Sequence, residues 1–406
     1  MPINRAWVGF FSLAVFTVTL FQNCSAGNFE VVHSAGGMNA KESASLDIGG
    51  NRNGNQKSLN IDPLQGTLLI STFGAYSPDT FTTGKFAFGG WMSESDSNDY
   101  LQALENGANP SSIFGPDKIF ITDVGATPDA TLRNVKRALA VRGFHINDPV
   151  IIKPPSDLSV DRSSWLYMYF TMLDNNLAEN CRQRNATLLE CPELFTGHDV
   201  GLASSVDGGV TWEYRGKVIV ANQSGDANGA WMPSARVVGD QIYLYYSTGR
   251  QTFDDENIYL QILAPDGVTP VGDAQNVNIN TFKTGDLYAN IDVHEIKEDN
   301  RNAFLMTANS GNQKKLHLFF SEDGIEFKEL PESPIVASDI ADQYVITPSI
   351  RSWGIEQLNG HETLKDTDQI FLFLDYATRG GSGPFEIRSL RLQIQNPFFQ
   401  ASDLIN

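Results

Sequence analysis

Short runs of apolar, β-branched and aromatic residues fill most of the chain after about residue 60, and Gly, Asp, Asn and Pro separate them. Runs of this length between turn residues predict β-strands. The two best helical candidates, Asp99 to Glu105 and Ala130 to Ala140, are both short. The hydrophobic pattern therefore predicts an all-β protein.

The predicted strands recur in a fixed order. One unit begins at Asp148-Pro149, continues through a Tyr-rich strand at 166–170 and a strand at 200–204, and ends at Asp207-Gly208 before Trp212. The same order repeats in units that begin near residues 232, 291 and 347, and more weakly from residue 85. Asp-Gly pairs at 207, 266 and 323 fall where hairpin turns need a positive φ.

Units of four short strands at a regular period predict the blades of a five-bladed β-propeller, formed by residues 59–406 as a single domain. The strand-like run at 66–73 could pair with the C-terminal segment, which would remove an exposed sheet edge. A β-sandwich, or two stacked β domains, is the alternative.

The N-terminus has the features of an export signal. Arg5 precedes an apolar run at 8–21, which has the length of a signal-peptide core and is too short for a comfortable membrane span. The run ends before Cys24, and a Cys in this place resembles the lipid acceptor of bacterial lipoproteins. This implies a signal peptide at 1–23, a lipid on Cys24 and a flexible Gly-, Asn- and Ser-rich tether at 24–58.

The residues before Cys24 depart from the usual small-residue pattern of lipoproteins, so the alternative is a secretory signal with an incidental Cys. We expect a lipid-anchored protein of the cell envelope, in the periplasm or at the outer membrane. Two cysteines remain, Cys181 and Cys191, and an oxidising compartment would let them form a disulfide rather than stay as free thiols. Their spacing does not suggest zinc, and no cofactor is predicted, although a structural calcium stays open.

The charge balance limits the classes of partner that the protein can bind. There are 29 basic and 48 acidic residues, which gives a formal net charge of −19. Nucleic acid needs a basic surface, so this composition excludes it as a partner and suits a soluble exported domain. We expect a monomer that meets the membrane only through its lipid.

The order of Asp-Pro, Tyr-rich strand, Gly-Leu-Ala-Ser-Ser, Asp-Gly and Trp over 148–212 resembles the five-bladed propeller glycoside hydrolases. These include the arabinanase and xylosidase group (family 43), the invertase and levansucrase group and the mannoside phosphorylases. The resemblance covers about residues 80–395 and implies a carbohydrate ligand without naming the sugar. Residues 205–212 also fit the Asp box of sialidases, so a six-bladed sialidase-like propeller is the alternative fold.

Asp148 is the first catalytic candidate. Glycosidic hydrolysis needs two carboxyl groups across the scissile bond, and the inner strands of a propeller bring residues of different blades together. Asp148 matches the position where the resemblance places the general base, and Asn147 matches the Asn-Asp-Pro of invertases. His145 precedes them on the same strand as a further ligand contact. A turn cap before Pro149 is the alternative role of Asp148.

Asp292, His294 and Glu295 begin the apolar run at 291–296, at the place expected to be equivalent to Asp148. Ionisable groups are costly to bury unless they face a polar cavity. Strand alternation places Asp292 and His294 on one face, expected toward the channel, and Glu295 on the other, toward the surface or a neighbouring blade. The general acid stays open between Asp292 and Glu295, and a structural ion pair is the alternative for either.

Three further residues are candidates for ligand binding. Arg236 and Arg351 occupy the same offset in two Pro-Ser-x-Arg segments and could clamp the carboxylate of an acidic sugar, or else form ion pairs between blades. Trp231 could stack on a sugar face or pack in the core. Met232 and Thr347 stand where the family pattern would place a helper Asp.

The sequence thus predicts a glycoside hydrolase-like envelope lipoprotein that acts on an oligosaccharide or polysaccharide. The missing helper carboxylate supports the alternative of a non-catalytic surface lipoprotein that binds a glycan or a protein.

Overall fold

The computed structural model describes residues 67–72, 74–81, 85–91, 94–123, 133–155, 164–184, 191, 196–221, 229–249, 257–280, 289–298, 301–310, 315–330, 333, 336–337, 343–351, 369–380 and 385–395. The predicted signal peptide, Cys24 and the tether lie outside these residues. Within them, no helix is long and apolar enough to span a membrane.

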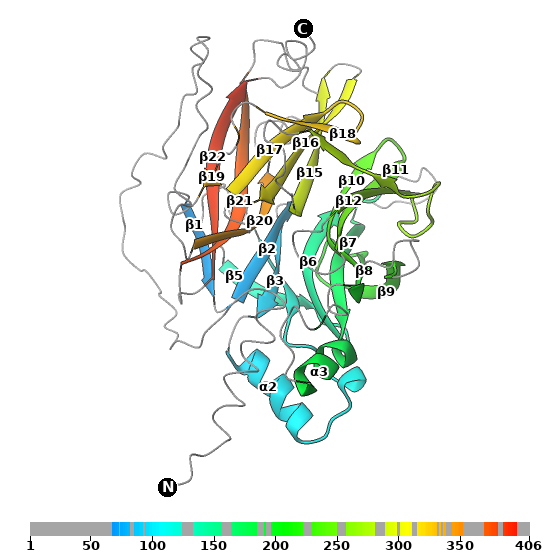
Figure 1. The fold of residues 1–406 in the computed structure, drawn as a ribbon, viewed down its shortest axis with the longest axis vertical. Coiled ribbons are helices and arrows are strands. Elements are labelled where there is room, and N and C mark those ends of the chain that lie inside the picture. Colours follow the sequence, from blue (N-terminus) through cyan, green and yellow to red (C-terminus); the bar gives the residue numbers. More distant parts are fainter. Residues whose placement is uncertain are drawn as a thin grey trace.

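The strands form five sheets, which confirms the all-β prediction (Figure 1). Sheet 1 contains β2 (Gly74–Phe81), β3 (Lys85–Trp91), β4 (Lys118–Asp123) and β5 (Arg133–Leu139). Sheet 2 contains β6 (Phe144–Ile152), β7 (Leu166–Asp174), β8 (His198–Ser205) and β9 (Glu213–Ile219). Sheet 3 contains β10 (Gly229–Val238), β11 (Gln241–Gly249), β12 (Asn257–Leu263) and β13 (Gln275–Asn276).

Sheet 4 contains β15 (Ala289–Glu298), β16 (Arg301–Ser310), β17 (Lys315–Ser321) and β18 (Glu326–Glu329), with β14 (Asn278–Asn280) beside β18 and β19 (Val336–Ala337) beside β17. Sheet 5 contains β20 (Gln343–Arg351), β21 (Gln369–Gly380) and β22 (Phe385–Gln395), and β1 (Thr67–Thr72) pairs antiparallel with β22. The strand predicted at 66–73 therefore does complete the sheet formed by the C-terminal segment.

The first strands of the five sheets lie side by side. Contacts join β2 to β6, β6 to β10, β10 to β15, β15 to β20 and β20 to β2. We call these five the inner strands. Their cyclic order brings residues from distant parts of the sequence close together.

Apolar cores lie between successive sheets. One cluster joins sheets 1 and 2, a second joins sheets 2 and 3, and a third joins sheets 3 and 4. A sheet covered on both faces buries nearly every residue, as in β6 and β7, so its strands form continuous apolar runs without clear alternation.

A β-bulge interrupts every inner strand at a corresponding place. The pairing register skips two residues in each strand, at 77–78, 148–149, 232–233, 290–291 and 346–347. In sheets 1 to 3 the second skipped residue is Pro, which has no N–H to pair and therefore suits an unpaired position. The bulges mark the same level of the five inner strands.

Two of the three predicted Asp-Gly turns, at 266 and 323, contact the preceding sheet. Gly208, Gly267 and Gly324 all have positive φ, and the preceding Asp of each turn accepts backbone N–H groups of the same turn. Tyr169 of β7 donates its hydroxyl to the Gly267 carbonyl of sheet 3 at 3.0 Å. Tyr245, at the same register of β11, donates to the Gly324 carbonyl of sheet 4 at 3.0 Å. One contact thus occurs twice between successive sheets.

Two helices lie together at one end of the molecule (Figure 1). α2 (Glu94–Glu105) includes the predicted helix at Asp99 to Glu105, whereas the helix predicted at Ala130 to Ala140 is wrong. Residues 133–139 form β5 instead, because pairing with β4 outweighs the helical preference of Ala, Leu, Lys and Arg. α3 (Asn175–Gln183), which the sequence did not predict, follows the N-cap Asp174.

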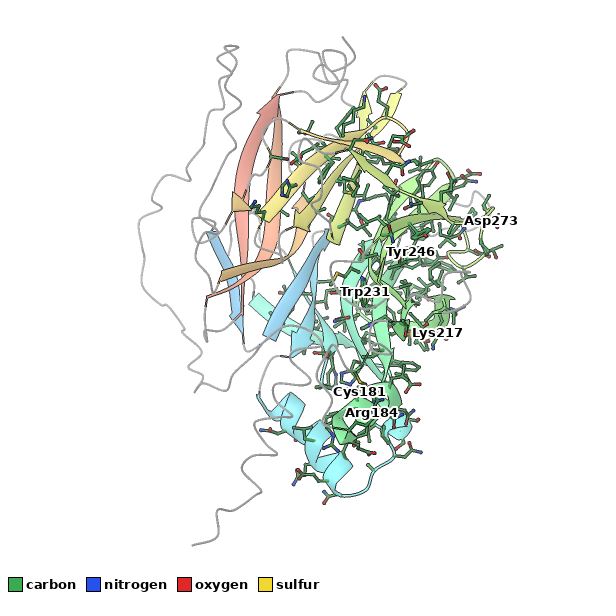
Figure 2. The ribbon with its side chains drawn as sticks, viewed as in Figure 1. Cys181, Arg184, Lys217, Trp231, Tyr246 and Asp273 are labelled. Carbon is green, nitrogen blue, oxygen red and sulfur yellow. A yellow bond between two sulfur atoms is a disulfide. The ribbon has the colours of Figure 1, made fainter. Side chains whose placement is uncertain are left out.

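The predicted disulfide between Cys181 and Cys191 is present, with a Cα–Cα distance of 6.0 Å and both residues fully buried. It fixes the C-terminal end of α3, where Figure 2 shows Cys181 and Arg184 close together. The guanidinium of Arg184 lies 3.1 Å from Sγ of Cys191.

Candidate functional site

Asp148 is the first residue of the bulge in β6. Its φ is 47°, in the left-handed region that few residues other than Gly adopt, and its side chain is buried, with 5% of the residue exposed. Met232, at the same place in the bulge of β10, has a φ of 49°. The backbone conformation therefore belongs to the repeated bulge, and the feature specific to β6 is a carboxylate in this position.

Thr171 of β7 supports the bulge of the next sheet. The Met232 N–H donates to Oγ1 of Thr171 at 2.7 Å, so sheet 2 holds the bulge of sheet 3 directly. This contact could not be predicted from the sequence, because a single Thr in an apolar strand resembles any other strand residue.

His145 is buried and is held from two sides. Its Nδ1 lies 3.3 Å from Oδ2 of Asp117, which is also buried, and the ring of Tyr100 from α2 meets the imidazole edge-on at a centroid distance of 5.4 Å. Burial raises the pKa of Tyr100 well above its usual range, with a smaller contribution from the charge of Glu179. His145 therefore connects the beginning of β6 to the helical end of the molecule. Sequence reasoning missed Asp117, which belongs to no motif.

Asp292 is bound by the neighbouring inner strand. Its Oδ1 accepts hydrogen bonds from Oγ of Ser234 at 2.8 Å and from the guanidinium of Arg236 at 2.9 Å. Oγ of Ser234 also accepts the N–H of Val293 at 2.9 Å. The predicted alternative of an ion pair between blades therefore describes the observed contact of Arg236 and Asp292.

The register corrects the expected equivalence of Asp148 and Asp292. Asn290 is the first residue of the bulge in β15 and so corresponds to Asp148. Asp292 follows that bulge, at the level of Val150 in β6 and Ser234 in β10. No Pro marks the bulge Asn290-Ile291, so the sequence alone does not show where the bulge of β15 lies.

His294 is buried beside this ion pair. Burial, and secondarily the positive charge of Arg236, lower the pKa of His294 to about 3. The imidazole is therefore neutral at physiological pH and can accept or donate a hydrogen bond without a charge.

Glu295 lies on the other face of β15. Its cross-strand neighbour is Phe304, which belongs to the apolar core between sheets 3 and 4. Burial raises the pKa of Tyr245 well above its usual range, and the charge of Glu295 is one of the smaller causes. Glu295 therefore lies on the face of β15 that is turned toward sheet 3.

Trp231 is buried and its ring meets the imidazole of His198 edge to face, at a centroid distance of 5.0 Å. Figure 2 shows it inside the body of the sheets. Trp231 therefore packs against His198 of β8. Asn147 is buried directly before the bulge of β6. Arg351 ends β20, and its side chain, like that of Thr347, lies outside the described part.

Within the described residues, His, Cys, Asp and Glu side chains form no group of three that could hold a metal ion. Two of the candidate residues on the inner strands form pairs with charged partners: Asp292 with Arg236, and His145 with Asp117.

No protein-family model matches the sequence, and a search of curated proteins gives no match. A thermostable family-43 glycoside hydrolase is 12% identical, with a TM-score of 0.47, over 78% of this chain and 89% of the other. An α-L-arabinofuranosidase from Lactobacillus brevis is also 12% identical, with a TM-score of 0.47, over 82% and 94%. An N-acetylgalactosamine deacetylase from F. plautii, in complex with blood group B trisaccharide, is 11% identical, with a TM-score of 0.47, over 81% and 94%.

TM-scores below 0.5 and identities this low assign neither a fold nor an activity to the chain.

Proposed function

We propose that this chain is a glycoside hydrolase-like β-propeller of five blades, which holds an oligosaccharide or polysaccharide where its inner strands converge. The five sheets, the cyclic order of the inner strands and the completion of sheet 5 by β1 support five blades over the six-bladed alternative. The observation that carries the proposal is Asp148, a buried carboxylate that a left-handed bulge holds at this convergence.

Asp148 is the proposed general base. In an inverting reaction it takes a proton from the water that attacks the anomeric carbon, while a second carboxyl group donates a proton to the leaving oxygen. The backbone positions within or next to the five bulges hold three carboxylate residues, Asp79, Asp148 and Asp292. Asp292 is engaged by Arg236 and Ser234, so Asp79, directly after the bulge of β2, is the remaining acid candidate.

A second candidate function is glycan binding without hydrolysis. The engagement of Asp292 with Arg236 and the position of Glu295 toward the apolar core both favour it, because these were the two acids expected from the sequence. The same observation weakens the idea that Arg236 clamps the carboxylate of an acidic sugar.

A hydrolysis screen with Asp148→Asn separates the two candidates. The full chain, purified in detergent, is incubated with plant, microbial and peptidoglycan glycans, and products are quantified beside a binding measurement on the same glycans. Hydrolysis should fall at least a hundredfold in Asp148→Asn, and Asp79→Asn should fall similarly if it is the acid. The exposed Asp240→Asn is the matched control and should keep full activity.

Glycan binding without product in any of these proteins would favour the binding module. Neither binding nor product from any glycan would refute the proposal as a whole.

We also propose that the chain is a lipoprotein of the cell envelope, anchored through Cys24. Labelled palmitate should enter the wild-type chain in a bacterial host and should not enter Cys24→Ser. Equal labelling of the two proteins would contradict the anchor.

A further inference from the structure

The residue that faces a bulge from the preceding sheet occupies one repeated position. Gly89 of β3 and Thr171 of β7 each pair with the residue just before the bulge of their own inner strand, Tyr76 and Asn147 respectively. Each of them also meets the bulge of the next sheet, at Asp148 and at Met232. We call this position a seat: it is the residue of one sheet against which the bulge of the following sheet packs.

The two seats are filled differently. Thr171 fills its seat with a hydroxyl that accepts the Met232 N–H at 2.7 Å. Gly89 has no side chain, and the bulge of β6 occupies the space instead. A Cβ added at Gly89 would lie 2.8 Å from Cβ of Asn147, 3.0 Å from its Cα and 3.1 Å from the Asp148 nitrogen.

We infer that Gly89 is a positioning residue for Asp148, which rests on the function proposed above. A Cβ at 2.8 Å from another Cβ is closer than real contacts allow, and the neighbouring atoms belong to the backbone and Cβ of β6. They cannot rotate away as the end of a long side chain can. A side chain at Gly89 must therefore push the β6 bulge, and the carboxylate of Asp148 with it, away from β3.

Replacing Gly89 by Ala should not strain the backbone, so the effect of the added Cβ on β6 can be measured alone. Its φ lies outside the left-handed region, in contrast to that of the next residue, Gly90, with a φ of 130°. Ala at position 89 therefore keeps an ordinary backbone conformation, and its effect comes from the contact with β6.

The test compares Gly89→Ala with Gly324→Ala in the full chain. Gly324 is in sheet 4, where a Cβ would meet the hydroxyl of Tyr245, so its variant loses stability without touching β6. Gly89→Ala should lower kcat/KM on the glycan from the screen by about tenfold to a hundredfold, mainly through kcat, since displacements below 1 Å affect the reacting geometry. Gly324→Ala should stay within about twofold of wild type at a temperature where both variants are folded.

A second measurement does not depend on activity. Amide hydrogen exchange should accelerate selectively at residues 145–150 in Gly89→Ala, compared with the other inner strands, whereas Gly324→Ala should not single out this segment. If the wild type acts on no glycan, the proposed function fails, and the exchange result alone decides on Gly89. Wild-type exchange in this segment, or wild-type kcat/KM in folded Gly89→Ala, would overturn the inference.

If Gly89→Ala does not fold, the equivalent seat provides the test. Thr171→Val removes the acceptor of the Met232 N–H and should accelerate amide exchange at residues 230–233. Thr171→Ser keeps the hydroxyl and should show the exchange rates of the wild type. Equal exchange in these two variants would overturn the idea that this position seats the next bulge.

Discussion

Gly324→Ala is predicted to destabilise the protein far more than Gly208→Ala, although both glycines follow Asp in turns of the same kind. Their φ values are 76° and 69°, so Ala meets the same backbone strain at both sites. A Cβ at Gly324 would lie 2.6 Å from the hydroxyl oxygen of Tyr245 and 3.1 Å from Cε2 of Phe304, whereas nothing lies within 4 Å of a Cβ at Gly208. Comparing the two variants separates the free-energy cost of the left-handed backbone from the cost of the contact with Tyr245 and Phe304.

The backbone term costs about 1–2 kcal/mol at either site, because a residue with a Cβ resists the left-handed conformation. At Gly324 the Tyr245 hydroxyl must also move away from the carbonyl that it now meets at 3.0 Å. A buried hydroxyl that loses its acceptor costs about 1–3 kcal/mol, and crowding against the Phe304 ring adds about 1–3 kcal/mol. We therefore expect a loss of about 3–8 kcal/mol for Gly324→Ala and about 1–2 kcal/mol for Gly208→Ala.

Urea-induced unfolding of the three proteins, followed by tryptophan fluorescence and circular dichroism, measures both losses. Tyr245→Phe should cost about 1 kcal/mol alone but should offset part of the Gly324→Ala loss in the double variant, because it removes the colliding oxygen. Equal losses for Gly324→Ala and Gly208→Ala would refute the reasoning, and additive effects of Gly324→Ala and Tyr245→Phe would show that the two positions do not interact.

Three further predictions follow from the buried groups. Arg236→Met should cost about 3–5 kcal/mol because it leaves Asp292 buried without its guanidinium, and adding Asp292→Leu should recover most of this loss in urea unfolding. The pKa of His294 is about 3 in the fold and near 6.5 when unfolded, so its stabilisation is complete above pH 6.5 and disappears between pH 6.5 and 3. His294→Gln should flatten this decline by up to about 1.4 kcal/mol per pH unit, and an unchanged slope would contradict the assignment. Loss of the Cys181–Cys191 disulfide, with its sequence separation of 10, should cost about 2–3 kcal/mol, seen as a fall in Tm on reduction that the double Ser variant does not show.

The repeated strands could be predicted from the sequence because each blade-like unit carries both an apolar run and a turn signal. The repeat could be recognised from the evenly spaced Asp-Gly turns at 207, 266 and 323, and the glycines of these turns do adopt positive φ. The first inner strand, β2, was missed because its core, Ser-Pro-Asp-Thr, is too polar to stand out. Its Ser77-Pro78 was a usable signal, since it repeats the X-Pro of the bulges in β6 and β10.

The site was harder to predict than the fold, because a bulge changes the relation between sequence position and side-chain direction. Each bulge adds residues to one strand and so resets the alternation of faces beyond it. Asp148 was proposed from the Asp-Pro pair that carries the family resemblance, and the same Pro149 lies in its bulge. Asn290-Ile291 lacks that marker, so the sequence placed Asp292 at the level of Asp148, two residues away from its position in the register.

Asp79 was not identified from the sequence because β2 itself was not predicted as a strand, although the adjacent Pro78 marks its bulge as Pro149 marks that of β6. It follows the bulge of β2, as Asp292 follows the bulge of β15, but β2 lies beside β6, the strand that carries Asp148. An inverting reaction needs its second carboxyl group about 6.5–9.5 Å from the first. Asp292 is held by Arg236 of β10, so Asp79, on the strand beside β6, is the acid candidate that we propose to test by mutation.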